Sequence, residues 1–482
     1  MNIGLIWFRR DLRLDDNPAL LAASRECDSL IAAFIHAPQE EGDHILGEAS
    51  HWWLHYSLLA LDQSLRTRGS RLILLEGESE QHVKRLVDRA GVTRVYWNRL
   101  YEPKTIPRDT QIKTALETAG IEVRSFNAQL LYEPWQVKNR QGGPFRVFTP
   151  FWKACLAKGD SPPPADTPPT LPPTPEAVKG TALESLGLLP HISWDSGMQD
   201  AWQPGEASAR KQLQRFCDNA LLDYKEARDH PDVAGTSRLS PHLHFGEIGP
   251  RRVVAEVQRS AAQNPASGWI GAAEGFIRQI YWREFGHHLL YHFPESVEKP
   301  IDERFQAFPW GTDYQKALRA WQKGRTGIPM VDAGMRELWH TGWMHNRVRM
   351  LVASLLTKNL LIPWQEGERW FRDTLVDADL ANNVMGWQWT AGCGVDAAPY
   401  FRIFNPVTQG QRFDPSGDYV RRWLPELAKL PTKLIHAPWA ADASELARHG
   451  IRLGKDYPRP IVDLKATRER ALAAYGEIRT SA

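Results

Sequence analysis

A proline-rich segment one third of the way along the chain divides it into two parts. Eight of the fifteen residues at 161–175 are proline. Proline fixes φ and lacks a backbone N–H, so such a segment disfavours both a helix and a central strand. The 482 residues are about three times the length of a typical domain. We therefore expect two domains, residues 1–130 and 206–482, joined by a linker at 131–205.

The first 130 residues alternate short apolar segments with amphipathic ones. The apolar segments, which we interpret as strands, lie at 3–8, 30–35, 72–75, 92–98 and 121–126. Strands that alternate with helices predict a parallel, doubly wound α/β sheet. No GxGxxG follows the first strand, where WFRRDL stands instead, so ordinary NAD binding by this part is disfavoured.

The part from residue 206 onward contains one amphipathic helical pattern after another, without β-rich runs. It predicts an all-α domain of roughly 270 residues, large enough to hold a cofactor in its core. The expected fold class is therefore an α/β domain followed by an all-α domain.

Composition and charge exclude several classes of protein. The 59 Lys and Arg residues nearly balance the 57 Asp and Glu residues, which excludes a polycation and an acidic disordered chain, so any contact with nucleic acid must be local. Four cysteines without a CxxC indicate neither a zinc cluster nor a disulfide framework, and we expect no metal. Because no apolar run approaches the ~20 residues of a membrane span, we expect a cytoplasmic protein without membrane contact.

Residues 235–248, GTSRLSPHLHFGEI, bring hydroxyls and backbone amides to the start of an expected helix. This combination suits phosphate binding. The alternative is that Thr236 or Ser240 is an ordinary N-cap.

Residues 341–350, TGWMHNRVRM, bring an aromatic ring, an amide, a guanidinium and a thioether together. Trp343 could stack on a heterocycle, Asn346 could contact a ring edge and Arg347 could pair with phosphate. Met350 lies one helical turn beyond Asn346 on the same face. The alternative for Met350 is core packing.

Residues 375–389, LVDADLANNVMGWQW, contain paired aspartates and alternating indoles. Asp377 and Asp379 could bind magnesium, but the run lacks the ligand count of a calcium loop, so hydrogen bonds to a polyol or a ring N–H are an equal alternative. Trp387 and Trp389 would point in different directions, one to a ligand and one to the core. Eleven of the twenty tryptophans lie between 269 and 423, which also fits a large aromatic core.

Together these motifs resemble the DNA photolyase/cryptochrome family. WFRRDLRLDDNPAL, GTSRLSPHLHFGEI, YWREFGHHLL, TGWMHNRVRM, DADLANN followed by WQW, and DAAPYFRIFNP occur in the order of that family and cover nearly the whole chain. The resemblance is strongest to bacterial cyclobutane pyrimidine dimer photolyases, and more finely to their class III. It implies an N-terminal α/β antenna domain, a linker, and a helical domain that buries a U-shaped FAD.

The resemblance implies a set of FAD-binding residues, with Arg349 and Asp377 paired beside the ring and Asn383 facing the redox-active nitrogen. The set is Tyr224, Thr236, Ser237, Arg238, Leu239, Ser240, Arg283, Asn346, Arg349, Asp377, Asp379 and Asn383. Photolyases typically have Asn at the last position, whereas plant cryptochromes have Asp and animal ones Cys, which favours repair over signalling. The resemblance also implies an electron relay through Trp387, Trp364 and Trp310. Core packing remains the interpretation for Trp321, Trp339 and Trp370.

The implied substrate is UV-damaged DNA, with a pyrimidine dimer held between Trp282 and Trp389 and against Met350. The residues implied at the DNA are Gln279, Trp282, Arg283, Asn346, Arg347, Met350, Trp389, Arg402 and Gln409. Dimer photolyases commonly have Glu where this chain has Gln279, and (6-4) photolyases often have Gln there. The (6-4) enzymes have His where this chain has Met350, and methionine cannot donate a proton. We therefore predict dimer repair, with a (6-4) photolyase that uses His345 as its acid, or a photosensor without repair, as alternatives.

The antenna chromophore is the least constrained part of this prediction. In folate-binding relatives a polar pair follows the YE motif, but here Tyr101 and Glu102 precede Pro103 and Lys104. Methenyltetrahydrofolate is our first expectation and a deazaflavin the second. The short tail after Asp463 favours an enzyme over a signalling protein, and we expect a monomer with no obligate protein partner.

Overall fold

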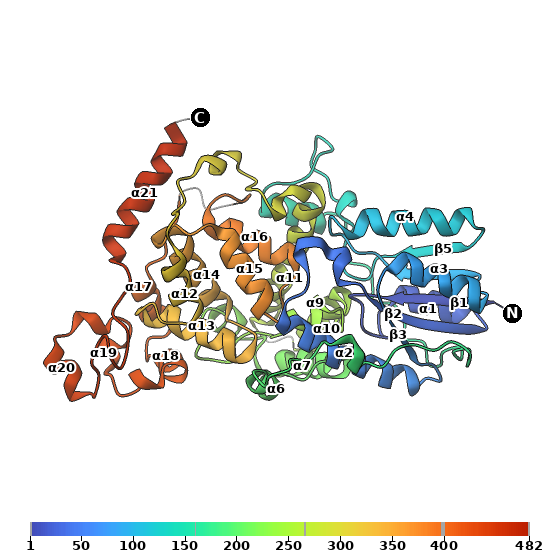
Figure 1. Ribbon diagram of the computed structural model, residues 1–482, viewed down its shortest axis with the longest axis horizontal. Helices are drawn as coiled ribbons and strands as arrows, with labels where there is room; N and C mark the ends of the chain where they lie inside the picture. Colours follow the sequence, from blue (N-terminus) through green and yellow to red (C-terminus); the bar gives the residue numbers. More distant parts are fainter. Residues whose placement is uncertain (1, 160, 265–266, 397–400, 481–482) are drawn as a thin grey trace.

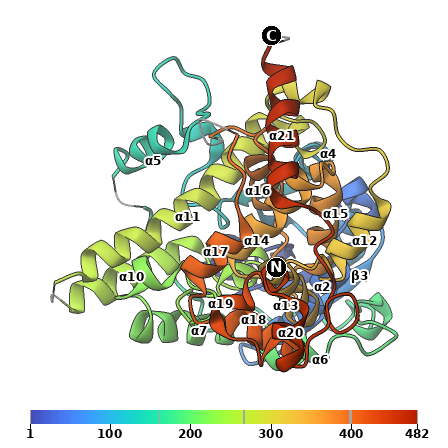
Figure 2. The same cartoon turned by 90° about the vertical axis from the view of Figure 1, so that its left-hand side faces the viewer.

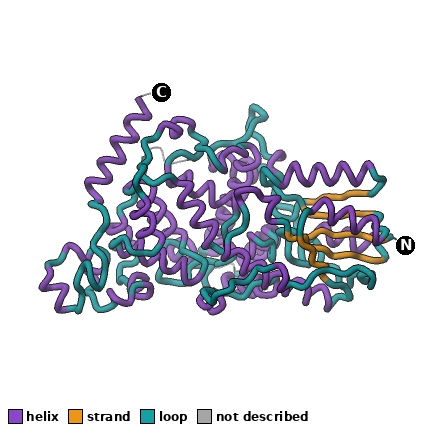
Figure 3. The backbone as a smooth tube through the Cα atoms, in the orientation of Figure 1, coloured by secondary structure: helices purple, strands orange, loops and turns teal. Residues whose placement is uncertain are grey.

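The computed structural model describes residues 2–159, 161–264, 267–396 and 401–480. One end of the molecule is a five-stranded sheet, and helices make up the rest (Figure 1, Figure 3). All strand pairs are parallel, in the order β3-β2-β1-β4-β5. The strands are β1 Ile3–Phe8, β2 Ser29–His36, β3 Leu72–Glu76, β4 Arg94–Asn98 and β5 Glu122–Phe126. This arrangement confirms the predicted doubly wound sheet.

Helices cover both faces of the sheet, which explains why the strands are apolar on both sides. Ile6 and Phe8 of β1 pack toward α1 and α2, whereas Leu5 and Trp7 pack toward α3 and α4. The helices of this part are α1 Pro18–Glu26, α2 Glu48–Arg66, α3 Ser79–Ala90 and α4 Thr105–Thr118.

The segment between the two parts contains helices that its prolines had led us to overlook. They are α5 Phe148–Leu156 and α6 Ser196–Ala201, and α5 lies beside α11 (Figure 2). Residues 161–175 form no helix or strand. They are nevertheless held along the sheet, since the backbone N–H of Leu171 donates to Arg68 at 2.9 Å and that of Leu30 donates to Pro173 at 3.1 Å. This proline-rich segment thus packs against the sheet domain through backbone hydrogen bonds.

The second part is helical, as predicted. Its helices are α7 Glu206–Asn219, α8 Tyr224–Ala227, α9 Ser240–His244, α10 Pro250–Gln263, α11 Trp269–His292, α12 Gln315–Gln322, α13 Pro329–Thr341, α14 Asn346–Ser354, α15 Trp364–Thr374, α16 Leu380–Ala391, α17 Pro406–Phe413, α18 Asp418–Trp423, α19 Thr432–Ile435, α20 Ala443–Arg448 and α21 Leu464–Thr480, with a π-helical turn at Leu355–Asn359. Among the described residues, no helix is both long and apolar enough to cross a membrane.

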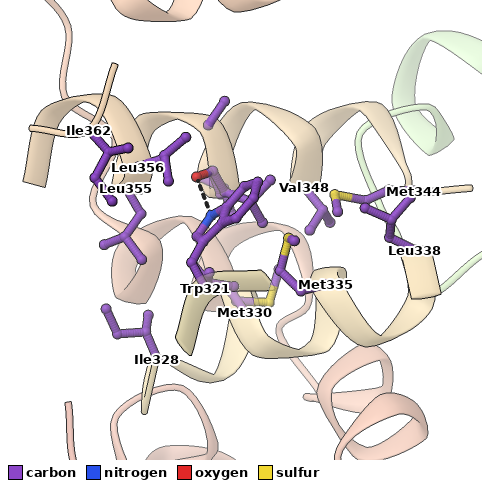
Figure 4. Close-up of a cluster of buried hydrophobic side chains, with 14 of the residues drawn as sticks. Trp321, Ile328, Met330, Met335, Leu338, Met344, Val348, Leu355, Leu356 and Ile362 are labelled. Atoms are coloured by element: carbon purple, nitrogen blue, oxygen red, sulfur yellow. Dashed lines mark hydrogen bonds between the residues drawn. The ribbon is translucent and has the colours of Figure 1, made fainter. Parts of the chain in front are cut away.

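Trp321 lies at the centre of the helical core (Figure 4). Its indole is fully buried, and its N–H donates to the carbonyl of Val352 at 2.9 Å. Core packing is therefore confirmed for Trp321. It is wrong for Trp339, which is 57% exposed and stacks on the half-buried Trp370 with ring centres 6.0 Å apart. The helix α13 that carries Trp339 turns that position to solvent.

Candidate functional site

The three motif segments of the helical part, far apart in the sequence, meet at one place. Arg349 of α14 donates through Nη2 to both carboxylate oxygens of Asp377, at 3.0 and 2.8 Å. Trp343, just before α14, donates through Nε1 to Ser240 at 3.4 Å. The guanidinium of Arg238 lies 5.0 Å from a ring centre of Trp343. The pairing of Arg349 with Asp377 is the one that the resemblance implies.

The loop before α9 carries the guanidinium of Arg238 and does not cap the helix through a side chain. Its N-cap is Leu239, which makes no side-chain capping bond, so neither Thr236 nor Ser240 is the N-cap of α9. Arg238 adopts a left-handed conformation with φ 51°, and its buried Nε has no acceptor among the described residues. Burial lowers the pKa of Arg238, whereas the charges of Glu337 and Asp377 raise it. A phosphate oxygen would supply the missing acceptor.

Asp379 forms the N-cap of α16 and carries a negative charge at a buried position. Its Oδ1 accepts from the backbone N–H of Asn382 at 2.9 Å, and its Oδ2 lies 3.4 Å from Nε2 of His287. Burial alone would raise the pKa of Asp379, but its contact with His287 and the charge of Arg283 hold it well below its usual range. One turn along α16, Asn383 donates to Oε1 of Glu368 at 3.1 Å.

The contacts of Asp377 and Asp379 can be compared with the alternative that these two carboxylates bind magnesium. The carboxylate of Asp377 is engaged by Arg349, and that of Asp379 caps a helix. Within the part of the chain that the structure describes, no group of three His, Cys, Asp or Glu side chains could hold a metal ion. The two aspartates are therefore arranged as hydrogen-bond acceptors.

The remaining residues expected at FAD differ in burial. Tyr224 and Leu239 are buried, Thr236 and Ser237 are half-buried, and Asn346 and Ser240 are exposed. Arg283 donates to the backbone carbonyl of Gln129 at 2.7 Å, so this cation links the helical part to the segment that follows the sheet.

The residues expected at the lesion occupy α11, α14 and α16. Trp282 is half-buried, and its ring lies parallel to that of Phe148, with centres 3.7 Å apart. Trp389 is half-buried, and its indole N–H donates to the backbone carbonyl of Asp396 at 3.1 Å. Gln279 accepts a long hydrogen bond from Arg228, at 3.4 Å. Sequence reasoning had not singled out Phe148, Asp396 or Arg228.

The residues expected at the DNA backbone differ in their exposure and in the partners that they have within the protein. Arg347 forms an ion pair with Asp229 at 2.6 Å, and its guanidinium lies 4.3 Å from the ring centre of Phe413. Arg402 is exposed, whereas Gln409 and Met350 are half-buried. A phosphate contact of Arg347 would therefore compete with Asp229, a partner that the sequence pattern did not reveal.

His345 is a buried helix cap, a position that disfavours the acid role that the (6-4) alternative required. Its Nδ1 accepts from the backbone N–H of Arg347 at 3.2 Å, at the N-terminus of α14. Burial lowers the pKa of His345 to about 4. The imidazole is therefore neutral at pH 7 and has no proton on Nδ1 to give.

We predict that His345→Asn reduces the acid sensitivity of the fold. An unfolded His titrates near 6.5, so the neutral cap contributes its full stability above pH 6.5 and loses it as the pH falls toward 4. The gap between the two pKa values corresponds to about 3 kcal/mol. Asn retains an N-cap acceptor but does not titrate. Thermal denaturation between pH 7.5 and 5.5 should show a smaller loss of Tm for the variant, and identical curves would contradict the prediction.

The three tryptophans of the expected relay lie in or against the helical core. Trp387 is 2% exposed and lies against Gly367 of α15, where an added Cβ would come within 2.1 Å of its ring. Trp364, the first residue of α15, is also buried. Trp310 is half-buried and contacts Phe308, with ring centres 4.5 Å apart. The three indoles thus differ in exposure, with the outermost position at Trp310.

A cavity of about 390 Å³ lies between the two parts of the molecule. Arg10, Glu102 and Lys104 line it from the sheet side, and Lys299 and Leu380 line it from the helical side. Arg10 forms an ion pair with Glu102. Burial raises the pKa of Glu102, although the charge of Arg10 opposes this. Leu380 is the first residue of α16, so one helix borders both this cavity and the site around Asp379.

Known proteins match this chain over its whole length. Residues 4–172 match the family described as DNA photolyase, and residues 276–477 match the FAD binding domain of DNA photolyase. The deoxyribodipyrimidine photo-lyase of Agrobacterium fabrum is 48% identical over 476 residues, which are 98% of each chain. The chain belongs to the DNA photolyase/cryptochrome family. The family resemblance of the motifs is thereby confirmed.

Further members of the photolyase/cryptochrome family allow the chain to be compared with a photolyase and with a cryptochrome separately. A bacterial class III photolyase from Agrobacterium tumefaciens superposes with a TM-score of 0.95 and 47% identity, covering all of this chain and 98% of that one. Cryptochrome-1 of Arabidopsis thaliana is 42% identical over 98% of this chain and 70% of its own length. The similarity is therefore greater to these bacterial photolyases than to this plant cryptochrome.

Proposed function

We propose that the chain is a light-driven photo-lyase that splits cyclobutane pyrimidine dimers in DNA. The observation that carries this proposal is the meeting of three motif segments: Arg238 and Ser240 contact Trp343, Arg349 pairs with Asp377, and Asp379 caps α16 beside His287 of α11. Helices α11 and α16 also carry Trp282 and Trp389. The 48% identical Agrobacterium relative bears the name of this activity.

The residues of the site fit FAD. The buried Nε of Arg238, which lacks an acceptor among the described residues, and the neighbouring hydroxyls of Thr236 and Ser237 suit the phosphates. The ionised Asp379 and the paired Asp377 offer acceptors to the sugar chain and the ring. Reduced FAD, when bound and excited by light, supplies the electron that opens the cyclobutane ring and takes it back afterwards. Trp387, Trp364 and Trp310 would supply electrons to the site from the surface.

The DNA residues favour the cyclobutane dimer over the (6-4) adduct. Met350 cannot donate a proton, and His345 is buried with its Nδ1 engaged as the acceptor at the start of α14. Trp282 and Trp389 offer apolar ring faces to an extruded pair of adjacent pyrimidines, and a damaged dinucleotide costs less to extrude than an intact one. UV-damaged DNA is therefore the proposed partner, with Gln279 at the thymine edge and Arg347, Arg402 and Gln409 at the backbone.

Gln279→Glu tests the lesion assignment. Arg228 lies 3.4 Å from the Gln279 carbonyl oxygen, so a carboxylate there would gain a charged partner while still accepting from a thymine N–H. Charge-assisted hydrogen bonds are roughly twice as strong as neutral ones. We expect the variant to repair dimers at least as fast as the wild type, with the exposed Gln263→Glu as a control. A loss of about tenfold or more, equivalent to about 1.4 kcal/mol, would contradict the assignment.

The cavity between the domains is the proposed antenna site. Methenyltetrahydrofolate is the first choice, with Lys104 at the cavity as a partner for a carboxylate of its tail, and a deazaflavin is the second. An archaeal photolyase from Sulfolobus tokodaii with 31% identity is described with two FAD molecules, one of them implicated as a light-harvesting cofactor. We further propose that the chain is a cytoplasmic monomer with no obligate protein partner, and that its domains are bounded near residues 130 and 206.

The function is tested by illuminating the reduced, FAD-loaded protein with an oligonucleotide that contains one thymine dimer. The thymine absorbance, which the dimer lacks, should return in light and not in darkness. A photosensor without repair would respond to light and leave the absorbance unchanged, and that result would overturn the proposal.

A further inference from the structure

The ring of Trp282 is fixed from one side by a residue outside the helical domain. Phe148, the first residue of α5, lies parallel to it, with ring centres 3.7 Å apart and planes 8° apart. Phe285, one turn along α11, meets the same indole edge-on at 6.0 Å and 76°. Two contacts at roughly right angles leave the Trp282 ring little freedom to rotate.

The same Phe148 is tied to the second indole through one residue. Its backbone N–H donates to Oδ2 of Asp396 at 3.2 Å, and the backbone carbonyl of Asp396 accepts from Nε1 of Trp389 at 3.1 Å. The first amides of a helix have no partner within it, and Val147, the N-cap of α5, makes no side-chain capping bond. The carboxylate of Asp396 therefore accepts from a backbone amide at the start of α5, and its backbone carbonyl accepts from the indole of Trp389.

The backbone of Asp396 is itself unusual. Its φ of 54° lies in the left-handed region, which Asp and Asn adopt more readily than most residues but which most side chains disfavour. Such a conformation persists where surrounding contacts determine it. Here those contacts are the two hydrogen bonds to Phe148 and Trp389.

We propose that Phe148 and Asp396 are positioning residues that set the relative orientation of Trp282 and Trp389 at the lesion. The inference rests on the proposed function, which places a pyrimidine dimer between these two indoles. It assigns a role in lesion recognition to α5, a helix in the segment between the domains. Neither residue needs to touch the substrate, because each acts through an indole.

The test compares Asp396→Ala, Asp396→Asn, Phe148→Leu and the double variant Asp396→Ala/Phe148→Leu. Asn accepts a hydrogen bond and tolerates the left-handed backbone, whereas Ala does neither. Leu keeps apolar volume but removes the stacked ring. The measurements are KM and kcat for a dimer-containing oligonucleotide, the ratio of affinities for damaged and undamaged DNA in darkness, and light-driven reduction of FAD. Leu156→Ala at the exposed end of α5 and the exposed Asp418→Ala are the controls.

We expect Asp396→Ala and Phe148→Leu each to raise KM and lower the affinity ratio by about fivefold, the effect of roughly one hydrogen bond or ring contact. Asp396→Asn should stay near the wild type, and kcat and FAD reduction should not change. The effect of the double variant on KM and on the affinity ratio should be smaller than the two single effects combined, because both changes remove contacts that hold the same pair of indoles.

Wild-type values of KM and affinity ratio in Asp396→Ala and Phe148→Leu would overturn the inference, as would equal losses in Asp396→Asn and Asp396→Ala. If Asp396→Ala does not fold, Phe148→Leu and Asp396→Asn decide by the same criteria. Failure of the wild type to repair dimers would overturn the proposed function and this inference together. Wild-type repair with unaffected variants would overturn the inference alone.

Discussion

Replacing Trp387 by phenylalanine should abolish light-driven reduction of FAD while leaving repair by chemically reduced protein intact. The ring lies in a closed environment, against Gly367 and edge-on to Phe371 at 5.0 Å and Trp321 at 6.1 Å. Phenylalanine fits such a space with limited loss of packing, but its ring is much harder to oxidise than indole. The relay would therefore be broken at its first member.

Absorption spectra of the oxidised protein under blue light measure this effect directly. Trp423→Phe, a change at another indole against the same core, is the matched control. We expect the control to become reduced at the wild-type rate and Trp387→Phe to remain oxidised. Normal reduction of FAD in Trp387→Phe would show that this residue is only a core residue.

Asp377→Asn should lower the FAD content of the purified protein. The Asp377 carboxylate is 3% exposed and accepts both hydrogen bonds from Nη2 of Arg349, whose side chain is 24% exposed. Breaking a buried ion pair leaves the other charge without its partner, at a cost of 3–5 kcal/mol when both groups are buried. Because Arg349 is partly solvated, we expect about 2 kcal/mol, or about thirtyfold weaker FAD binding.

The ratio of flavin to protein absorbance after dialysis measures this loss. Glu80→Gln, which breaks the exposed pair with Lys84 in the sheet domain, should retain FAD like the wild type. Equal FAD content in Asp377→Asn and the control would show that the pair does not support the cofactor.

The fold could be predicted because its signals are local. Continuous apolar strands and intervening amphipathic helices fixed the sheet class, and the loss of strand patterns after residue 206 fixed the helical part. Helix α5 was missed because the nearby proline-rich segment at 161–175 led us to expect a linker. Its apolar residues at 148, 151 and 155 follow a helical spacing that could have revealed it.

The candidate site could be predicted only in part, since tertiary partners leave no spacing in the sequence. The family resemblance implied that Arg349 pairs with Asp377, and the structure shows this pair. The ion pair of Arg347 with Asp229 and the link from Phe148 to Asp396 join residues that are 118 and 248 positions apart. The spacing of residues within one segment cannot reveal contacts between residues that lie so far apart in the sequence.

Repair of cyclobutane dimers by this chain is tested most directly by comparing two lesions as substrates. The reduced wild-type protein is given two oligonucleotides in light, one with a cyclobutane thymine dimer and one with a (6-4) adduct, and the repaired strands are separated and counted. We expect repair of the cyclobutane dimer with the (6-4) adduct untouched. Repair of the (6-4) adduct with the cyclobutane dimer untouched, or repair of neither, would contradict it.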